Sequence, residues 1–414
     1  MAPRALLALL TLAVRARSVF MPQIFSDGVV LQTPADGGAP ASLFGYANPG
    51  EAVAVNMTIG ASLTRYAATA DAAGKWRVVV APAAGDDPAP KGVAFSVAAA
   101  SDAAPTVIRN ASFGEVLLCN GQSNLVLSVA AASNPVGRAA PPSPQLQRTT
   151  WPDVRLFSVI STNSSVPMRG LPLANNSRGD KDCTWGYVAN MTPSSKLVCT
   201  TWQVAAPGVT DFFSAECFYA AHNLVTSGAI PAGRTVGLVQ TAYSGTAMEL
   251  WLPESALTGC PARANAPAAG ASPPWIPGCL AADGPVVACL FNSMVYPIIG
   301  FAVRAVLHNQ IESNMGDSFE YYACVFQNMV ATWRALWGQD FPWVTTGLGD
   351  QGFSPDDGGK NVGFPSYVAT PRDGQAAILA GRYPGVSRTA RGGIVSAYDL
   401  GDRVGNPNGV SQRA

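Results

Sequence analysis

Hydrophobic and polar positions follow two different patterns along the chain. Between residues 20 and 110, short alternating or β-branched runs recur at 51–58, 75–80 and 93–97. These runs are separated by turn signals: Asn48-Pro-Gly, Asp71-Ala-Ala-Gly and Gly85-Asp-Asp-Pro. Short strands spaced by such turns are typical of antiparallel sheets. The pattern therefore predicts a small all-β sandwich over residues 19–110.

From residue 112 onward, strand-like and helix-like segments alternate. An apolar run at 113–119 ends in a polar turn at 120–124, and a helical pattern follows at 125–132. Later helical patterns lie at 214–227 and 321–337. Strand patterns lie at 235–240, 343–348 and 394–399, and a helical pattern joined to a strand pattern lies at 291–309. Residues 133–205, rich in Pro, Ser and Asn, are interpreted as a surface insertion. The alternation predicts an α/β domain with a mostly parallel sheet over residues 111–414.

Composition excludes several classes of protein. Of the 414 residues, 48% are hydrophobic and 13% are charged, and 26 basic residues balance 26 acidic ones. A net charge of zero offers no electrostatic attraction for nucleic acid or for an anionic membrane. No apolar run after the N-terminus is long enough to span a bilayer, so we expect no membrane insertion.

The N-terminus is typical of a secretory signal. Arg4 precedes an apolar stretch at 5–14, and the small residues Ala16 and Ser18 are suitable for a cleavage site. We therefore expect a signal peptide over residues 1–18, with a misassigned start as the alternative. Asn-x-Ser/Thr acceptor sequences for glycosylation occur at Asn56, Asn110, Asn163, Asn175 and Asn190. The predicted location is the extracellular space or the lysosomal or endomembrane lumen.

The cysteine count fits the same compartment. Eight cysteines are present, and an even number is consistent with disulfides formed under oxidising conditions. No Cys-x-x-Cys pair occurs and the chain has two histidines, which disfavours a zinc site. The first pairs we expect are Cys183 with Cys199 and Cys260 with Cys279, although the sequence leaves the connectivity open.

Ser123 is the first candidate for chemistry. It lies in a polar turn directly after an apolar strand, and ligands of open α/β sheets bind at the carboxyl ends of strands. A serine there can act as a nucleophile, with backbone N–H groups stabilising the oxyanion. The alternative is an N-cap serine for the following helix.

The segment around Ser123 also resembles a known family. Residues 114–124, GEVLLCNGQSN, are similar to GEVWLCSGQSNM of the sialate O-acetylesterases, which are secreted or lysosomal SGNH-type hydrolases. Five more segments resemble the family in order: QIFSDGVVLQ at 23–32, ADAAGKW at 70–76, FSAEC at 213–217 (family FSAVC), GLVQTAYSGTAMELW at 237–251 and NQIESN at 309–314 (family YQGESN). The resemblance implies a three-layer α/β/α hydrolase of the SGNH type after an N-terminal all-β sandwich.

The resemblance also implies roles for individual residues. Ser123 would be the nucleophile, and its N–H, the N–H of Gly245 and the side-chain amide of Gln310 would form the oxyanion hole. Asn124 and Glu312 are the expected substrate-binding residues. The structural alternatives are a tight turn with positive φ for Gly245, a capped strand end for Gln310 and a loop hydrogen bond for Glu312.

The general base of the family, a histidine in an Ile-His-Pro motif, is missing. Residues 397–403, AYDLGDR, resemble the segment that precedes this motif, but Val410-Ser-Gln follows at the expected position. Asp399, preferred over Asp402, would orient that histidine. The two histidines present are His222, interpreted as a packing or surface residue, and His308, which approaches the site if its strand alternates.

Three explanations for this departure stay open. A truncated or frameshifted gene near residue 405 is the one we expect, and a non-hydrolysing sugar-binding homologue or a weaker water-assisted esterase are the others. The predicted activity is removal of O-acetyl groups from sialic acid. Deacetylation of another glycan such as xylan, or carbohydrate binding without catalysis, are the alternatives. The expected partner is an O-acetylated sugar or glycan, and no metal or organic cofactor is implied.

Overall fold

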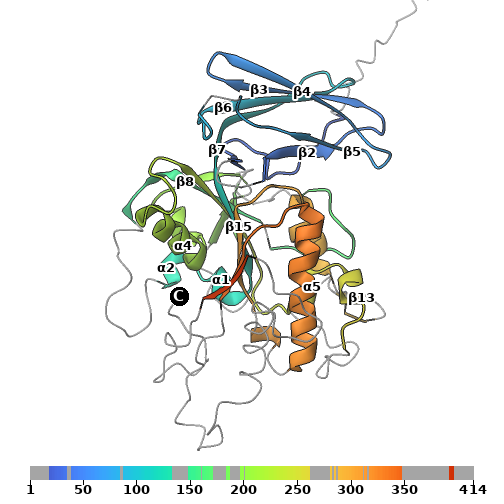
Figure 1. Cartoon of the computed structure of the whole chain (residues 1–414), viewed down its shortest axis with the longest axis vertical. Helices are drawn as coiled ribbons and strands as arrows, with labels where there is room; N and C mark the ends of the chain where they lie inside the picture. Colours follow the sequence, from blue (N-terminus) through green and yellow to red (C-terminus); the bar gives the residue numbers. More distant parts are fainter. Residues whose placement is uncertain are drawn as a thin grey trace, which may run out of the picture.

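One long strand, β7 (Thr106–Gly121), connects the two β-rich regions of the molecule (Figure 1). The computed structural model describes residues 18–34, 39–83, 87–132, 148–159, 161–170, 183–186, 196–199, 201–261, 280–281, 284–285, 288–310, 312–314, 317–346 and 391–395. The first half of β7 pairs antiparallel with β6 (Val93–Ala99), and its second half pairs in parallel with β12 (Thr235–Ala242). The predicted boundary between residues 110 and 111 therefore falls inside a single strand.

Most strands of the N-terminal region pair antiparallel, as the alternation predicts. β2 (Ser42–Tyr46) pairs with β5 (Lys75–Val79), and β3 (Ala52–Ile59) pairs with β4 (Ser62–Thr69) and β6. The short β1 (Val30–Gln32) runs parallel to the middle of β7. The hydrophobic core continues from these strands into the second region, where Phe25 packs against both Phe44 and Phe301. A separate sandwich domain over 19–110 stays a prediction.

A large, mostly parallel sheet forms the second region and confirms the mixed α/β class. Its strand order is β11-β8-β12-β7-β15-β16-β17. The strands not yet bounded are β8 (Trp151–Ser158), β11 (Gln203–Ala205), β15 (Ala305–Asn309), β16 (Trp343–Thr346) and β17 (Gly392–Val395). Short two-stranded pairs lie outside it: β9 (Cys183–Gly186) with β10 (Lys196–Cys199), and β13 (Leu280–Ala281) with β14 (Gly284–Pro285).

Two helices cover opposite faces of this sheet. α4 (Ala215–Thr226) packs with Leu117 and Cys119 of β7, whereas α5 (Phe319–Trp337) shares a core with Val116 and Leu118. Because alternate residues of a strand point to opposite faces, the two helices lie on opposite sides, as Figure 1 shows. The helices predicted at 214–227 and 321–337 are thereby confirmed.

Shorter helices connect the remaining elements. The helix expected at 125–132 is divided into α1 (Ser123–Val126) and α2 (Val129–Ala132). The 3₁₀ turns are η2 (Thr210–Phe212), η3 (Met248–Trp251), η4 (Glu254–Leu257), η6 (Tyr296–Ile298) and η7 (Glu312–Asn314), and η5 (Phe291–Val295) is a π-helix. None of the described helices is long and apolar enough to cross a membrane.

The interpretation of residues 133–205 as a surface insertion is wrong in part. β8, within that range, lies inside the central sheet and pairs in parallel with β12. Its Arg155 is buried, and Nη1 of Arg155 donates to the carbonyl oxygens of Gly28 (2.7 Å) and Asn110 (2.6 Å). These carbonyls, from two distant segments, replace water around the guanidinium group. A charged residue that the sequence places on the surface is thus accommodated in the core.

One of the two predicted disulfide pairs is wrong. Cys260 is bonded to Cys324 on α5, so the pairing of Cys260 with Cys279 is wrong. Packing of η4 against α5, where Asn328 Nδ2 donates to the carbonyl of Ala256 (2.7 Å), brings Cys260 to that helix. A further disulfide joins Cys119 of β7 to Cys217 of α4, and Cys289 is also disulfide-bonded.

Two other predictions concern processing and the remaining cysteines. The pairing of β9 with β10 sets Cys183 opposite Cys199, and their disulfide stays a prediction. Residues 1–17 of the predicted signal peptide lie outside the described residues.

Candidate functional site

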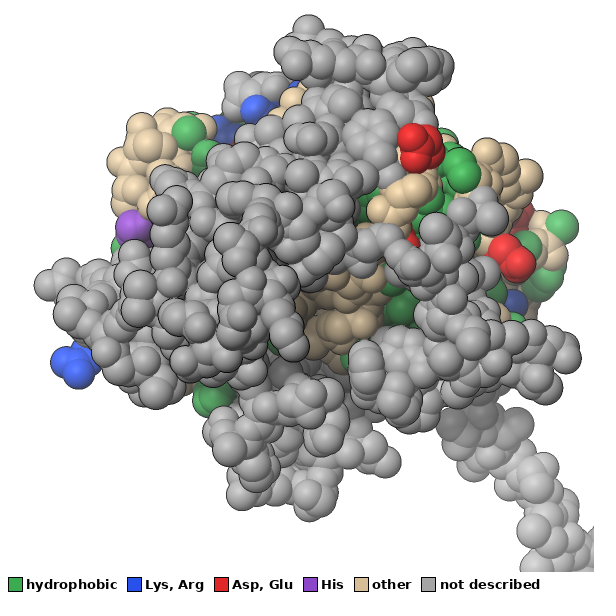
Figure 2. All heavy atoms as spheres, turned by 90° about the horizontal axis from the view of Figure 1, so that it is seen from below, with side chains coloured by type: hydrophobic (Ala, Val, Ile, Leu, Met, Phe, Trp, Pro, Cys, Tyr) green, Lys and Arg blue, Asp and Glu red, His purple; other side chains and the backbone are tan. Residues whose placement is uncertain are grey.

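The candidate site lies where the parallel strands end. β7, β12 and β15 pair in parallel and finish at Gly121, Ala242 and Asn309. The loops that follow are bonded to one another, because the N–H of Gln122 donates to the carbonyl of Asn309 (3.0 Å) and that of Tyr243 to the carbonyl of Gly121 (3.1 Å). Figure 2 views the molecule from this end and shows uncharged polar and backbone atoms near its centre, with hydrophobic side chains beside them.

Gly121 is required by close packing of the strands. A Cβ atom at this position would lie 2.0 Å from the carbonyl oxygen of Asn309. Two residues later, Ser123 begins α1, and Gln122 occupies the N-cap without a side-chain cap bond. The alternative that Ser123 is an N-cap serine is therefore wrong. Ser123 is partly exposed at the turn between strand and helix, where a nucleophile is accessible to substrate.

Glu312 holds the residues on both sides of Ser123. One carboxylate oxygen of Glu312 accepts from Gln122 Nε2 and the other from Asn124 Nδ2. The hydroxyl of Ser313 donates to Gln122 Oε1 (2.7 Å). The alternative interpretation of Glu312, a hydrogen bond within the loop, is thus confirmed, because its carboxylate positions the turn around Ser123. Asn124 Oδ1 is buried with no hydrogen-bond partner in the structure, and substrate binding by Asn124 stays a prediction.

Gln310 is fully buried and its amide hydrogens are both in use. Its Nε2 donates to the carbonyl of Thr246 (2.9 Å) and to Asn314 Oδ1 (2.8 Å). Asn314 Oδ1 also accepts from the backbone N–H of Met248 (2.9 Å), so both groups facing Nε2 are acceptors and the amide orientation follows from the network. The atom left over is the buried Oε1 of Gln310, which would repel an oxyanion rather than stabilise it.

Gly245 lies in the loop that Gln310 holds. Its φ of 72° is in the left-handed region that favours glycine, which confirms the tight-turn interpretation. The adjacent Thr246 is buried, and its hydroxyl donates to the carbonyl of Tyr243 (2.7 Å) and accepts from Trp251 Nε1 (3.1 Å). The loop is therefore fixed by its own side chains. An oxyanion-hole role for the N–H of Gly245 stays a prediction.

His308 is a buried packing residue. It lies between α5 and β16, with its ring centroid 5.1 Å from that of Trp343, and it is 1% exposed. Its Nδ1 lies 3.0 Å from Oδ1 of Asn120. Asn120 stands where the GEVWLCSGQSNM segment of the sialate O-acetylesterases has serine, and the structure brings it into contact with His308. Burial lowers the pKa of His308 to about 3, so its ring does not retain a proton taken from Ser123 at neutral pH.

The other residues considered for the general base are His222 and the aspartates Asp399 and Asp402. His222 is partly exposed on α4, and its ring meets that of Trp151 edge to face at 5.0 Å. This confirms its interpretation as a packing or surface residue. Asp399, and Asp402 with it, lies outside the described residues.

Sequence reasoning missed Glu216, which is partly buried at the same edge of the sheet. Its carboxylate accepts from Asn309 Nδ2 (2.6 Å) and from the hydroxyl of Thr346, and so joins the ends of β15 and β16. Burial raises the pKa of Glu216, and the charge of Glu312 raises it further, against the two hydrogen bonds. The sequence contained one indication of this residue: in FSAEC at 213–217, Glu216 stands where the similar segment FSAVC of the sialate O-acetylesterases has valine.

Comparison with known proteins confirms the resemblance to sialate O-acetylesterases. No protein-family model matches the chain. The sialate O-acetylesterases of Pongo abelii and Homo sapiens are each 25% identical to it over 325 residues, which cover 76% of this chain and 52% of those proteins. The chain thus spans about half the length of these relatives.

A solved structure is similar in fold. A carbohydrate acetylesterase from Xanthomonas citri superimposes with a TM-score of 0.62 at 23% identity, covering 93% of this chain and 70% of that one. At this identity the likeness concerns the fold alone, and it agrees with the mixed α/β architecture around a large central sheet.

Proposed function

We propose that this chain is a carbohydrate esterase that removes O-acetyl groups from sugars, with O-acetylated sialic acid as its substrate. The observation that carries the proposal is the turn at Ser123. Its hydroxyl is at the carboxyl end of the central strand, and Glu312 holds the two neighbouring residues. The similarity to sialate O-acetylesterases supports the substrate class. A deacetylase of another glycan such as xylan would use the same residues.

In the proposed mechanism Ser123 is the nucleophile. Its Oγ attacks the acetyl carbonyl carbon, a new Oγ–C bond forms, and the bond from that carbon to the sugar oxygen breaks. The proton of the Ser123 hydroxyl passes to the leaving sugar oxygen. Water then cleaves the acetyl-serine to acetate and restores the hydroxyl.

The N–H groups of Ser123 and Gly245 are the proposed oxyanion donors. Each donor of this kind typically contributes ~3–4 kcal/mol to transition-state stabilisation. Because both amide hydrogens of Gln310 are engaged, the proposal assigns Gln310 to holding the loop of Gly245 instead. Asp399 keeps its proposed role of orienting a general base.

A second candidate is a carbohydrate-binding homologue that does not hydrolyse its ligand. The positions of the two histidines favour it, since His308 is buried against Trp343 and His222 packs on Trp151. Serine enzymes that lack a triad member retain roughly 10³–10⁴-fold catalysis over water. A measured rate therefore discriminates between the two candidates.

The test compares the chain with Ser123→Ala on O-acetylated N-acetylneuraminic acid, acetylated xylan and an aryl acetate. We expect acetate release well above buffer from the sialic acid ester, and a loss of about 10³-fold or more in Ser123→Ala. Ser227→Ala, at the exposed end of α4, is the matched control and is expected to keep full activity. Equal rates for the chain and Ser123→Ala would reject the esterase and leave the binding protein.

The compartment is part of the proposal. We place the protein in the secretory or lysosomal lumen, where disulfides such as Cys119–Cys217 form.

A further inference from the structure

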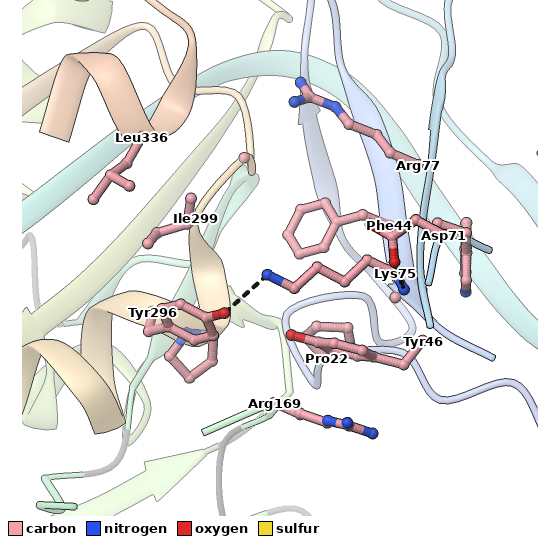
Figure 3. Close-up of a pocket in the computed structure, with 14 residues that line it drawn as sticks. Pro22, Phe44, Tyr46, Asp71, Lys75, Arg77, Arg169, Tyr296, Ile299 and Leu336 are labelled. Atoms are coloured by element: carbon pink, nitrogen blue, oxygen red, sulfur yellow. Dashed lines mark hydrogen bonds between the residues drawn. The ribbon is translucent and has the colours of Figure 1, made fainter. Parts of the chain in front are cut away.

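A pocket of about 390 Å³ lies at the other end of the sheet, between the β2–β5 pair and the segment that leads into β15 (Figure 3). The residues that matter come from four segments: Phe44 and Tyr46, Lys75 and Arg77, Arg169, and Tyr296. Sites for small molecules typically have volumes of roughly 300–1,000 Å³. Ile299 and Gly300 line the pocket before β15 begins, whereas Ser123 follows the end of the neighbouring β7. The pocket is therefore separate from the candidate catalytic site.

Strand pairing builds one wall of the pocket. β2 and β5 are antiparallel, with Tyr46 opposite Lys75 and Phe44 opposite Arg77. Residues two apart share a face of a strand, so two rings and two cations stand together on one face, as Figure 3 shows. The alternate residues of β5, Trp76 and Val78, are buried, whereas Val79 is exposed. The arrangement is set by backbone register and does not depend on flexible loops.

The lining is rich in positive charge. Three cations, Lys75, Arg77 and Arg169, share it with one carboxylate, Asp71, in a chain whose net charge is zero. Asp71 Oδ1 accepts hydrogen bonds from the backbone N–H groups of Ala73 and Lys75 (both 2.8 Å). This oxygen therefore stabilises the turn between β4 and β5. Within the described residues, neither Arg77 nor Arg169 forms an ion pair with a carboxylate.

The aromatic residues hold two of the cations at the pocket. Lys75 Nζ donates to the Tyr296 hydroxyl (2.9 Å), and this hydrogen bond raises the pKa of Lys75, which stays charged. The guanidinium of Arg169 lies 4.9 Å from the centroid of the Tyr46 ring. Burial raises the pKa of Tyr46, so its hydroxyl stays a neutral donor. The pocket thus offers ring faces, hydroxyls and two arginines that form no ion pair with a carboxylate of the described residues.

Gly300 keeps the far wall open. Its φ is 91°, and a Cβ there would come within 3.8 Å of both Phe44 and Arg77. The phenyl ring of Phe44 is itself fixed by an edge contact with Phe25, at 4.8 Å between centroids. Rings held by packing lose little entropy when a ligand stacks on them.

We propose that this pocket is an accessory site for a carboxylate-bearing sugar, of the sialic acid type, which it binds apart from Ser123. Arg169, whose guanidinium group lies against the Tyr46 ring, would hold the carboxylate, because a guanidinium group matches its two oxygens. Arg77, at the opposite end of the pocket, would add to the positive charge that attracts the anion (Figure 3). Tyr46 and Tyr296 would lie against the apolar face of the sugar ring and bond its hydroxyl groups. The choice of a sugar over an acidic peptide rests on the proposed function, whereas the choice of an anion rests on the charges.

The test measures binding of the methyl α-glycoside of N-acetylneuraminic acid by calorimetry and ligand-observed NMR, in the Ser123→Ala background. We expect millimolar binding that is weakened at least tenfold in the double variant Arg77→Gln/Arg169→Gln. Arg65→Gln, an exposed arginine on β4, is the matched control and should bind like its parent. Because all three arginines are exposed, melting temperatures should stay within about 2 °C of the parent.

Several outcomes would overturn the accessory site. These are no binding, equal binding by the double variant, or equal binding of the methyl ester that lacks the carboxylate charge. A glutamate-rich peptide that competes better than the sugar would overturn the sugar assignment. Failure of the proposed function appears elsewhere, as absent acetate release from the wild-type chain, so the two failures are distinguishable.

Discussion

The two ends of the central sheet hold their polar side chains in different ways. At the carboxyl end, Glu312 bonds Gln122 and Asn124, and Gln310 bonds Thr246 and Asn314, so most polar groups are engaged with one another. At the amino end, strand register sets cations beside aromatic rings, and no carboxylate of the described residues pairs with Arg77 or Arg169. The first arrangement fixes a geometry, whereas the second leaves charge available to a ligand. Substitutions should therefore cost stability at the carboxyl end and ligand affinity at the amino end.

The largest expected effect is that of Gly121→Ala. The new Cβ would meet the carbonyl oxygen of Asn309 at 2.0 Å, and a backbone atom cannot move without separating β7 from β15. We expect a loss of about 3 kcal/mol or more in the free energy of unfolding, measured by denaturant titration. Gly393→Ala on β17 is the control, because nothing lies within 4 Å of its Cβ position. Equal midpoints for the two variants would show that the close approach of the strands has no energetic role.

The next effect concerns acid stability and His308. Burial lowers the pKa of His308 from 6.5 to about 3, so the unfolded chain binds a proton that the folded chain excludes. The stability contribution is complete above pH 6.5 and is lost as the pH falls towards 3. This loss amounts to on the order of 2–3 kcal/mol between pH 6.5 and 4.5. His308→Gln keeps a donor for Asn120 but does not titrate, so we expect a flatter profile.

Thermal melting from pH 7 to 4.5 measures this difference. His222→Gln, on the partly exposed surface of α4, should retain the wild-type slope. If His308→Gln loses stability on acidification as steeply as the wild type, His308 is not the group responsible.

A smaller effect is expected for Glu312→Gln. An amide has one accepting oxygen, so the variant cannot serve both Gln122 and Asn124. The loss of one hydrogen bond to a charged group should cost about 1.5 kcal/mol of stability. In an active chain, kcat should fall more than KM rises, because Ser123 loses its fixed position. Glu320→Gln on the exposed face of α5 is the control, and an unchanged kcat in Glu312→Gln would exclude the positioning role.

Much of the fold could be predicted from periodicity. Alternation predicts β3, β5 and β6, because half-buried strands must alternate, and the helical pattern predicts α4 and α5. β8 was missed, because Arg155 and the prolines around it indicate surface. Its burial depends on the carbonyls of Gly28 and Asn110, which no local pattern indicates.

The position of the candidate site could be predicted from the sequence, but the hydrogen bonds between its side chains could not. Ser123 follows an apolar strand, and that order alone places it at the carboxyl end of the sheet. The engagement of Glu312 with Asn124, and of Gln310 with Thr246, could not be predicted, since these pairs are 188 and 64 residues apart along the chain. Glu216 likewise acquires its partners from the ends of two other strands.

The sequence by itself determined the alternation of strands and helices outside β8, the turn that carries Ser123 and the likeness to sialate O-acetylesterases. These follow from local periodicity and from short contiguous motifs. The tertiary structure alone decided that His308 is a neutral core residue, that Cys260 bonds Cys324, and that Tyr46 faces Lys75. Burial, disulfide pairing and strand register all depend on which distant segments meet, and that is settled by packing of the whole chain.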